Sequence, residues 1–368
     1  MPAIGFGARV TGGDQPNPRI IEVTTAGTGA GSLAEAVDVI DAPFESDQPT
    51  SPIPTPPTLI RIAAGLKIAA NRQPIVIQGR NVTIEGGAGS EIHANQLFFD
   101  CATADNIIVR NLKFTGTPDD PTPPRDTIFI DGTNGRQPTG LWIDHCEFQA
   151  YFDLNITLKA SDIGGAPPLL LTISNCLFHN DNPGGRHRDN NGGIAIAGFE
   201  DDSGNELSNR NINAYATVTG NLFRTVRRRS PRSSGLSVAH AFNNVLIEWG
   251  AGTSTTNQAN GMESGHDGLL VAQANFFRAG NLKPTIGIAT YDRKLKKNGG
   301  QLIIDDGDAT LKNKYANEAL ATAPTGSPFS ITRAYETFGI TPPTVVPMDP
   351  TLRARIEAAA GVPGGSGN

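Results

Sequence analysis

Three stretches, NIIVRNLKF (106–114), GLWIDHCEF (140–148) and LLTISNCLF (170–178), decide the fold. Each places apolar residues at every second position, then a short polar residue, then Leu or an aromatic. Strict alternation predicts a β-strand with one buried face. The pattern recurs in segments that begin at residues 81, 215, 236 and 269. Because the spacings are uneven and run from about 20 to 45 residues, they predict solenoid coils with loops of variable length.

Two other β architectures fit this pattern less well than a solenoid. A β-sandwich needs hairpin turns at short, regular spacing, and these gaps are too long and uneven. A parallel sheet with crossover helices needs helical patterns between strands, whereas these gaps are rich in Gly, Pro and Asn. A right-handed parallel β-helix fits best. In that fold Cys146 and Cys176, which fall at equivalent places, are expected to stack as buried free thiols.

The ends of the solenoid need covers. Residues 31–40 predict an N-terminal capping helix, with Ser32 and Glu35 spaced as a capping box. The alternation weakens after about residue 280, so residues 280–368 are expected to form irregular C-terminal loops and a short helix at 350–361 that packs on the solenoid. No domain boundary is visible, and residues 1–368 are expected to form a single domain.

Composition limits the partners. The chain carries 36 acidic and 30 basic residues, a formal net charge of -6. An acidic chain is a poor nucleic-acid binder, and no apolar run reaches transmembrane length. Against this background, arginines gather at 224, 227, 228, 229 and 232, which predicts a confined site for an anionic partner. If that segment is extended, Arg227 and Arg229 share a face and Arg228 lies opposite.

The motifs resemble polysaccharide lyase family 1, the pectate lyase superfamily, as a divergent member. GFGARVTGG (5–13), VTIEGG, NIIVRNLKF, DTIFID, LWIDHCEF and RRSPRSSGLSVAHAFNN follow in the family's order. The resemblance covers roughly residues 4 to 280. It implies a parallel β-helix that cleaves an acidic polysaccharide, polygalacturonate or pectin, by β-elimination.

The resemblance also implies site residues. Arg229 matches the family's catalytic arginine, and Asp126 matches the first acidic position of its calcium site. Asp144 and His145 match a signature whose role is structural support. Arginine is an unusual base, because its pKa exceeds about 12, whereas binding of a carboxylate is the easier role for it. Substrate carboxylates are therefore assigned to the further arginines Arg186, Arg188, Arg227 and Arg232.

The chain departs from the family at several positions. The next two calcium carboxylates match Tyr151 and Asn155, with Asp153 between them, so Asp126, Asp153 and Asn155 are the candidates for a Ca²⁺ cofactor. The family's active-site lysine falls at Gly192 or Gly193, and Ser234 replaces a further arginine. Because calcium ligands are depleted, a metal-independent, pectin-lyase-like enzyme is a serious variant.

Other functions stay open from the sequence. A carbohydrate-binding β-helix without efficient turnover fits the absent lysine, and hydrolysis by clustered carboxylates is a weaker option. The expected partner is an acidic polysaccharide, with no nucleic acid and no membrane, for a monomer. The N-terminus shows no signal peptide, and a secreted, extracellular protein is expected from the resemblance.

Overall fold

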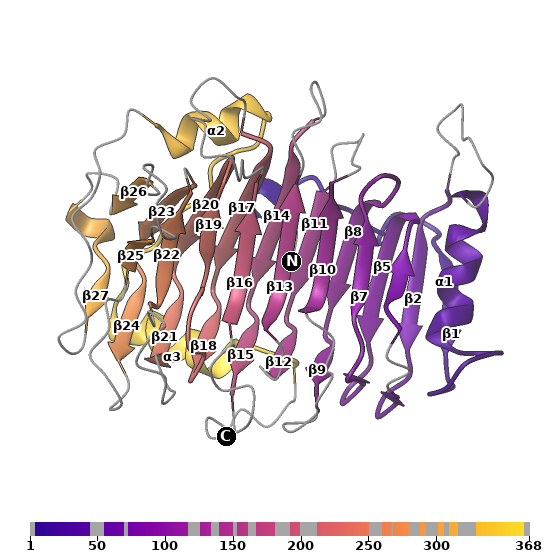
Figure 1. The fold of residues 1–368 in the computed structure, drawn as a ribbon. Coiled ribbons are helices and arrows are strands. Elements are labelled where there is room, and N and C mark those ends of the chain that lie inside the picture. Colours follow the sequence, from indigo (N-terminus) through magenta and orange to yellow (C-terminus); the bar gives the residue numbers. More distant parts are fainter. Residues whose placement is uncertain are drawn as a thin grey trace.

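The computed structural model describes residues 4–44, 55–69, 73–116, 126–133, 140–149, 153–160, 167–180, 192–198, 212–249, 260–266, 268–279, 288–291, 301–304, 309–315 and 329–363. Within them the chain winds through three parallel sheets, one strand of each sheet per coil, so every strand pairs with the equivalent strand one coil later. The strands lie side by side from one end of the molecule to the other (Figure 1). The parallel β-helix predicted from the alternation is confirmed.

The described part of the chain divides its strands among sheets A, B and C. Sheet A contains β1 (Arg19–Val23), β2 (Thr58–Ile62), β5 (Arg80–Gly86), β8 (Asp105–Arg110), β11 (Gly140–Asp144), β14 (Leu169–Ser174), β17 (Ala214–Thr219), β20 (Ser237–Phe242), β23 (Leu269–Gln273) and β26 (Gln301–Ile304). Sheet B contains β4 (Ile75–Ile77), β7 (Leu97–Asp100), β10 (Asp126–Gly132), β13 (Leu154–Ala160), β16 (Gly192–Ala197), β19 (Arg232–Ser234), β22 (Met262–Gly265) and β25 (Ile288–Tyr291). Sheet C contains β3 (Lys67–Ile68), β6 (Glu91–His93), β9 (Lys113–Thr115), β12 (Glu147–Gln149), β15 (Leu177–His179), β18 (Leu222–Arg224), β21 (Val245–Trp249), β24 (Phe276–Ala279) and β27 (Lys314–Tyr315).

Like residues stack on like inside the coils. In sheet C, Phe114, Phe148, Phe178 and Phe223 form a ladder with ring centroids 4.7 to 4.9 Å apart. These rings are buried, so each coil contributes a large apolar side chain to one continuous core. Cys146 and Cys176 are free, buried and stacked, with the Cys146 N–H 3.5 Å from Cys176 Sγ, as predicted.

A ladder of asparagines follows the turn between sheets A and C. Asn221, Asn244, Asn275 and Asn313 are buried, and each Nδ2 of the first three donates to Oδ1 of the next at 2.9 to 3.0 Å. The ladder bonds amides that would otherwise be buried without partners. The Asn that recurs after the alternating segments is therefore part of the fold and not of the chemistry.

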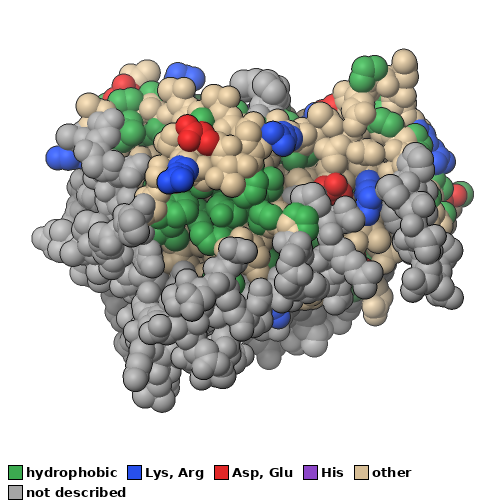
Figure 2. All heavy atoms as spheres, turned by 90° about the horizontal axis from the view of Figure 1, so that it is seen from above, with side chains coloured by type: hydrophobic (Ala, Val, Ile, Leu, Met, Phe, Trp, Pro, Cys, Tyr) green, Lys and Arg blue, Asp and Glu red, His purple; other side chains and the backbone are tan. Residues whose placement is uncertain are grey.

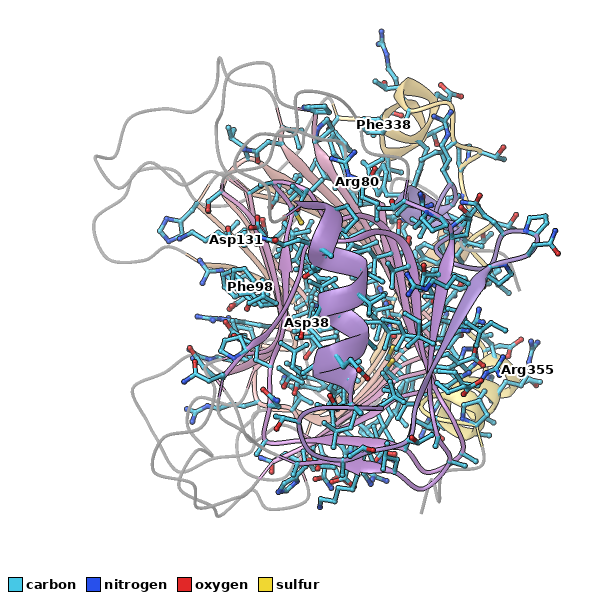
Figure 3. The ribbon with its side chains drawn as sticks, turned by 90° about the vertical axis from the view of Figure 1, so that its right-hand side faces the viewer. Asp38, Arg80, Phe98, Asp131, Phe338 and Arg355 are labelled. Atoms are coloured by element: carbon cyan, nitrogen blue, oxygen red, sulfur yellow. The ribbon has the colours of Figure 1, made fainter. Side chains whose placement is uncertain are left out.

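Helix α1 (Leu33–Asp41) covers the N-terminal end. Ser32 Oγ accepts from the Glu35 N–H at 3.1 Å, and the Glu35 carboxylate accepts from the Gly31 N–H, one residue before the capping-box position. The apolar face of α1, including Leu33 and Ile40, joins the core. In the end-on view α1 lies across the mouth of the solenoid (Figure 3).

The N-terminal GFG stretch lies on the outer face of sheet A. The Phe6 and Gly7 amides donate to the buried hydroxyls of Thr217 and Thr172 at 3.0 and 2.8 Å. Gly5 has a φ of +65°, and a Cβ on it would lie 2.2 Å from Thr217 Oγ1. This glycine is therefore required for the close approach.

The C-terminal segment is more regular than expected. Strands β25, β26 and β27 continue the coils past residue 280, and α3 (Pro350–Ala359) forms where a short helix was predicted. Helix α2 (Ile331–Thr337) was not predicted. It packs on sheet A through Tyr335, which stacks on Phe6 at 4.1 Å, while α3 packs on sheet C through Ile356. Among the described helices, none is both long and apolar enough to span a membrane.

Candidate active site

The arginine segment connects β18 to β19 and lies at one end of the outer face of sheet B. Arg228 forms a parallel bridge with Gly192, and the Ile194 N–H donates to the Arg229 carbonyl at 2.6 Å. Arg229 has a φ of +59°, a left-handed conformation that side-chain-bearing residues seldom adopt. Such conformations persist where the surrounding structure holds them, and they concentrate at functional sites.

Glu263 is the carboxylate that faces the arginines from the next coil. Its Oε1 lies 3.5 Å from Arg229 Nε and 4.0 Å from Arg232 Nε, and Arg232 and Glu263 are directly paired in the register of β19 and β22. Met262 belongs to the core, so Glu263 points to the outer face. With 4% of its surface exposed, Glu263 is a buried counter-charge for the arginines.

Arg228 pairs with Asp153, Nη2 to Oδ1, at 3.3 Å. Burial, and then the charge of Arg229, lower the pKa of Arg228. The segment is not extended at Arg229, where φ is +59°, so the alternation that would place Arg227 and Arg229 on one face does not apply. Arg227 is 1% exposed, whereas Arg228 pairs with Asp153 and Arg229 faces Glu263.

The calcium candidates are Asp126, Asp153 and Asn155, all in or next to β10 and β13. Asn155 Nδ2 donates to the Gly192 carbonyl at 3.3 Å, and Asn155 Oδ1 has no hydrogen-bond partner among the described residues. Asp153 already has a cation as its partner. Within the described ranges no three His, Cys, Asp or Glu side chains gather as metal ligands. Asp126 is 3% exposed, and its Oδ1 and that of Asn155 are buried acceptors without a hydrogen bond in the described part of the chain. Since Ca²⁺ takes six to eight oxygen ligands, the candidates among the described residues are too few to form a calcium site by themselves.

The positions of the missing lysine are explained by packing. A Cβ on Gly192 would lie 2.6 Å from Leu154 Cδ2, and a Cβ on Gly193 would lie 2.8 Å from the Arg229 carbonyl oxygen. At Gly193 the arginine segment occupies the space of a side chain, and at Gly192 the side chain of Leu154 does so.

The other predicted residues lie elsewhere. Arg186 and Arg188 fall outside the described residues. Asp144 and His145 lie at the end of β11 in sheet A, with Asp144 Oδ2 2.7 Å from His145 Nδ1. Burial alone would raise the pKa of Asp144, but hydrogen bonds from His145, Ser174 and Asn175 lower it. This network joins the coils of β11 and β14 in sheet A and does not face the arginine segment.

A second buried polar cluster lies under α2. His240 Nδ1 is 2.9 Å from the Tyr335 hydroxyl, and His240 Nε2 is 2.8 Å from Gln273 Oε1. Burial lowers the pKa of His240 to about 4. The two ring nitrogens are both engaged, so this histidine holds α2 on sheet A and is not placed for catalysis at sheet B.

Sequence reasoning missed Glu263. Aligning RSSGLSVA (232–239) with ESGHDGLLVA (263–272) places Glu263 opposite Arg232, because the strand of sheet B precedes the strand of sheet A in each coil. Seen from above, charged side chains of both signs are scattered singly and a hydrophobic patch lies between them (Figure 2).

The fold and this arginine-rich outer face together define a parallel β-helix of the polysaccharide-lyase type. The sequence model of the family described as pectate lyase matches residues 22–335, and the chain belongs to that family. The predicted resemblance is confirmed, and with it a pectate-lyase-like enzyme.

Solved structures of pectate lyases share the fold. A pectate lyase variant from Xanthomonas campestris is 18% identical, with 98% of both chains covered and a TM-score of 0.59. A pectate lyase from Bacillus sp. N165, in complex with trigalacturonate, is 17% identical, with the same coverage and TM-score. The cedar pollen allergen jun a 1 is 18% identical over 98% of this chain and 92% of its own, with a TM-score of 0.58. No curated protein matches the sequence significantly.

Proposed function

We propose that the protein cleaves a uronate-rich polymer, polygalacturonate or pectin, by β-elimination on the outer face of sheet B, with Arg229 as the base. The observation that carries this proposal is the convergence of Arg228, Arg229 and Arg232 with the buried Glu263 at one end of that face. The family assignment supports the reaction class. A similar structure in complex with trigalacturonate supports an acidic polysaccharide as the substrate.

The reaction sets the roles. The base takes the proton from C5 of a uronate, a double bond forms between C4 and C5, and the bond from C4 to O4 breaks. The electron pair leaves with O4, which then takes up a proton. Negative charge develops next to the C5 carboxylate, so fixed cations at that carboxylate stabilise the transition state.

The arginines supply those cations in this chain. Arg232 and Arg229 face the same carboxylate oxygen of Glu263, at 4.0 and 3.5 Å from their Nε atoms. Neither distance is a close bidentate contact, so a guanidinium can still bind a substrate carboxylate in that way. Three cations this close repel one another, and Glu263 and Asp153 offset part of that repulsion. We assign the base to Arg229 from its motif and its outward position. Arg228 is the second candidate, because its lowered pKa is the direction that a base requires.

Calcium has no step in this proposal. Asp153 is paired with Arg228, and the candidate ligands among the described residues are too few for a calcium site. We propose that arginines neutralise the substrate carboxylate in its place, as in the metal-independent variant. We further propose a secreted, monomeric, single-domain protein of residues 1–368, with residues 280–368 packed on the solenoid.

The test is ultraviolet absorbance with polygalacturonate and, separately, with highly methylated pectin. The expected result is a rise in absorbance, because β-elimination creates an unsaturated uronate. New reducing ends without absorbance would mean hydrolysis. Binding of either polymer without any product would mean a carbohydrate-binding β-helix and would overturn the proposal.

A further inference from the structure

One line of outward side chains crosses sheet B from β4 to β22. Consecutive strands from β4 to β22 pair these residues directly in register, and the row consists of Val76, Phe98, Phe129, Thr157, Ala195, Arg232 and Glu263. The flanking residues on the same strands, such as Phe99, Ile130 and Ile156, are fully buried in the core. Because side chains alternate along a strand, the row faces away from the core.

The two ends of this row differ. Arg232 and Glu263 form the charged end, beside Arg229. The other end is apolar, with Val76 41% exposed and the partly exposed Phe98 and Phe129 stacked at 5.4 Å and 9°. In the end-on view Phe98 projects from sheet B away from the core, next to Asp131 (Figure 3). The other described phenylalanine ladder is buried inside the coils, so this stack presents aromatic surface outside the core.

Two carboxylates accompany the aromatic end. Asp100 and Asp131 lie two residues after Phe98 and Phe129, therefore on the same face, and are paired in register. Both are held in place, since Asp131 Oδ1 accepts from the Thr133 N–H at 2.9 Å and Asp100 Oδ1 accepts from the Ala102 N–H at 3.0 Å. Lys159 pairs with Asp131 one strand further toward the arginines.

We propose that Phe98 and Phe129 form a sugar-binding subsite for a neutral, methyl-esterified uronate residue of the same polymer that is cleaved at Arg229. The proposal rests on the proposed function and deepens it. The apolar C–H face of a pyranose ring is attracted to the negative face of an aromatic ring. The carboxylates of Asp100 and Asp131 outnumber Lys159, the one described cation in register with them, so a free uronate carboxylate beside these rings is repelled, whereas an ester has no charge to repel.

The polymer that is cleaved at Arg229 can also occupy this subsite, because the row of outward side chains connects the two places. Phe129 lies three strands from Arg232 in the same row, about 14 Å at the usual strand spacing. Between them stand the small side chains of Thr157 and Ala195. A polymer with its cleaved residue at Arg229 and its chain along this row therefore passes over the two phenylalanines.

The test separates binding from catalysis. In the Arg229→Lys background, affinity electrophoresis compares highly methylated pectin with polygalacturonate, before and after Phe98→Leu and Phe129→Leu are added. Leucine keeps the apolar volume and removes the aromatic face. Binding to methylated pectin is expected to fall about tenfold, while binding to polygalacturonate changes less than about twofold. Asp100→Asn with Asp131→Asn is expected to improve binding to polygalacturonate.

An equal loss on both polymers, or no loss on methylated pectin, overturns the subsite. The binding result stands whether or not the wild-type protein forms an unsaturated product, so failure of the proposed function and failure of the subsite are told apart. Thermal unfolding of each variant shows whether the fold is intact.

Discussion

The outer faces of sheets A and B are built from similar strands but differ in how their buried polar groups are hydrogen-bonded. On sheet A, the GFG stretch and α2 cover the strands, and the hydroxyl of Thr217 bonds both the Phe6 amide and the Tyr335 hydroxyl. On sheet B, Asn155 Oδ1, Thr157 Oγ1 and Arg229 Nε are buried without a hydrogen-bond partner among the described residues. Buried polar groups are normally bonded.

The difference shows where a family signature supports the fold and where it serves the chemistry. GFG and WIDH are motifs of sheet A, and their groups bond neighbouring coils. The RSP motif is at sheet B, where the backbone is strained at Arg229 and like charges are held together. The motifs on sheet A thus supply hydrogen bonds between coils, whereas the motif on sheet B brings several positive charges together.

The largest expected effect is at Arg229. Arg229→Lys should lower kcat for unsaturated product by about 10²- to 10⁴-fold, the usual contribution of a positioned proton-transfer group. Arg278→Lys, on sheet C and paired with Glu248 at 3.7 Å, is the matched control and should keep full activity. If Arg228→Lys abolishes turnover and Arg229→Lys does not, the base has been assigned to the wrong arginine.

The next effect is at the counter-charge. Glu263→Gln removes a buried carboxylate from two arginines and should lower the free energy of unfolding by about 3–5 kcal/mol, because the arginine charges lose their partner. Glu248→Gln removes a carboxylate that is half exposed, and it should cost less than about 1 kcal/mol. Urea unfolding measures both. Equal small losses would show that the arginines are solvated and do not depend on Glu263.

On sheet A, the pH dependence should follow His240. Its pKa is about 4 in the folded protein, below the ordinary value of about 6.5, so the unfolded chain binds the proton more readily. The contribution to stability is complete above about pH 6.5 and is lost as the pH falls toward 4, by up to about 3 kcal/mol. His240→Gln should flatten this part of the urea-unfolding profile between pH 7 and 4. An unchanged slope would contradict the buried neutral imidazole.

The smallest effect is at the packing of the arginine segment. Gly193→Ala places a Cβ 2.8 Å from the Arg229 carbonyl and should cost about 1–3 kcal/mol, because backbone must shift. Gly27→Ala, which meets no heavy atom within 4 Å, is the control and should be neutral. If Gly193→Ala leaves the free energy of unfolding unchanged, the arginine segment can move to make room for a side chain. Close packing would then not explain why the lysine is missing.

The sequence predicts the solenoid well because stacking repeats the same apolar positions in every coil. Cys146, Cys176 and the Ser32 cap follow from such local patterns. The candidate site is harder to predict from the sequence, because the residues that interact there come from different coils joined by loops of uneven length. Arg229 is recognisable from its motif, whereas Glu263 is 34 residues later in the chain and becomes visible only when the coils are aligned. No sequence pattern indicates the left-handed backbone at Arg229, so the directions of the Arg227 and Arg228 side chains could not be predicted.

The most direct test of the account is the rate of unsaturated product from polygalacturonate and from methylated pectin, with calcium and with a chelator. We predict a rate that the chelator does not change, because arginines on sheet B take the place of the metal beside the substrate carboxylate. The rate should be greater on methylated pectin, because an ester carries no ground-state charge and the arginines then stabilise only the charge that develops in the transition state. A rate that appears only with calcium would contradict it, and would require carboxylates other than those described to hold the metal.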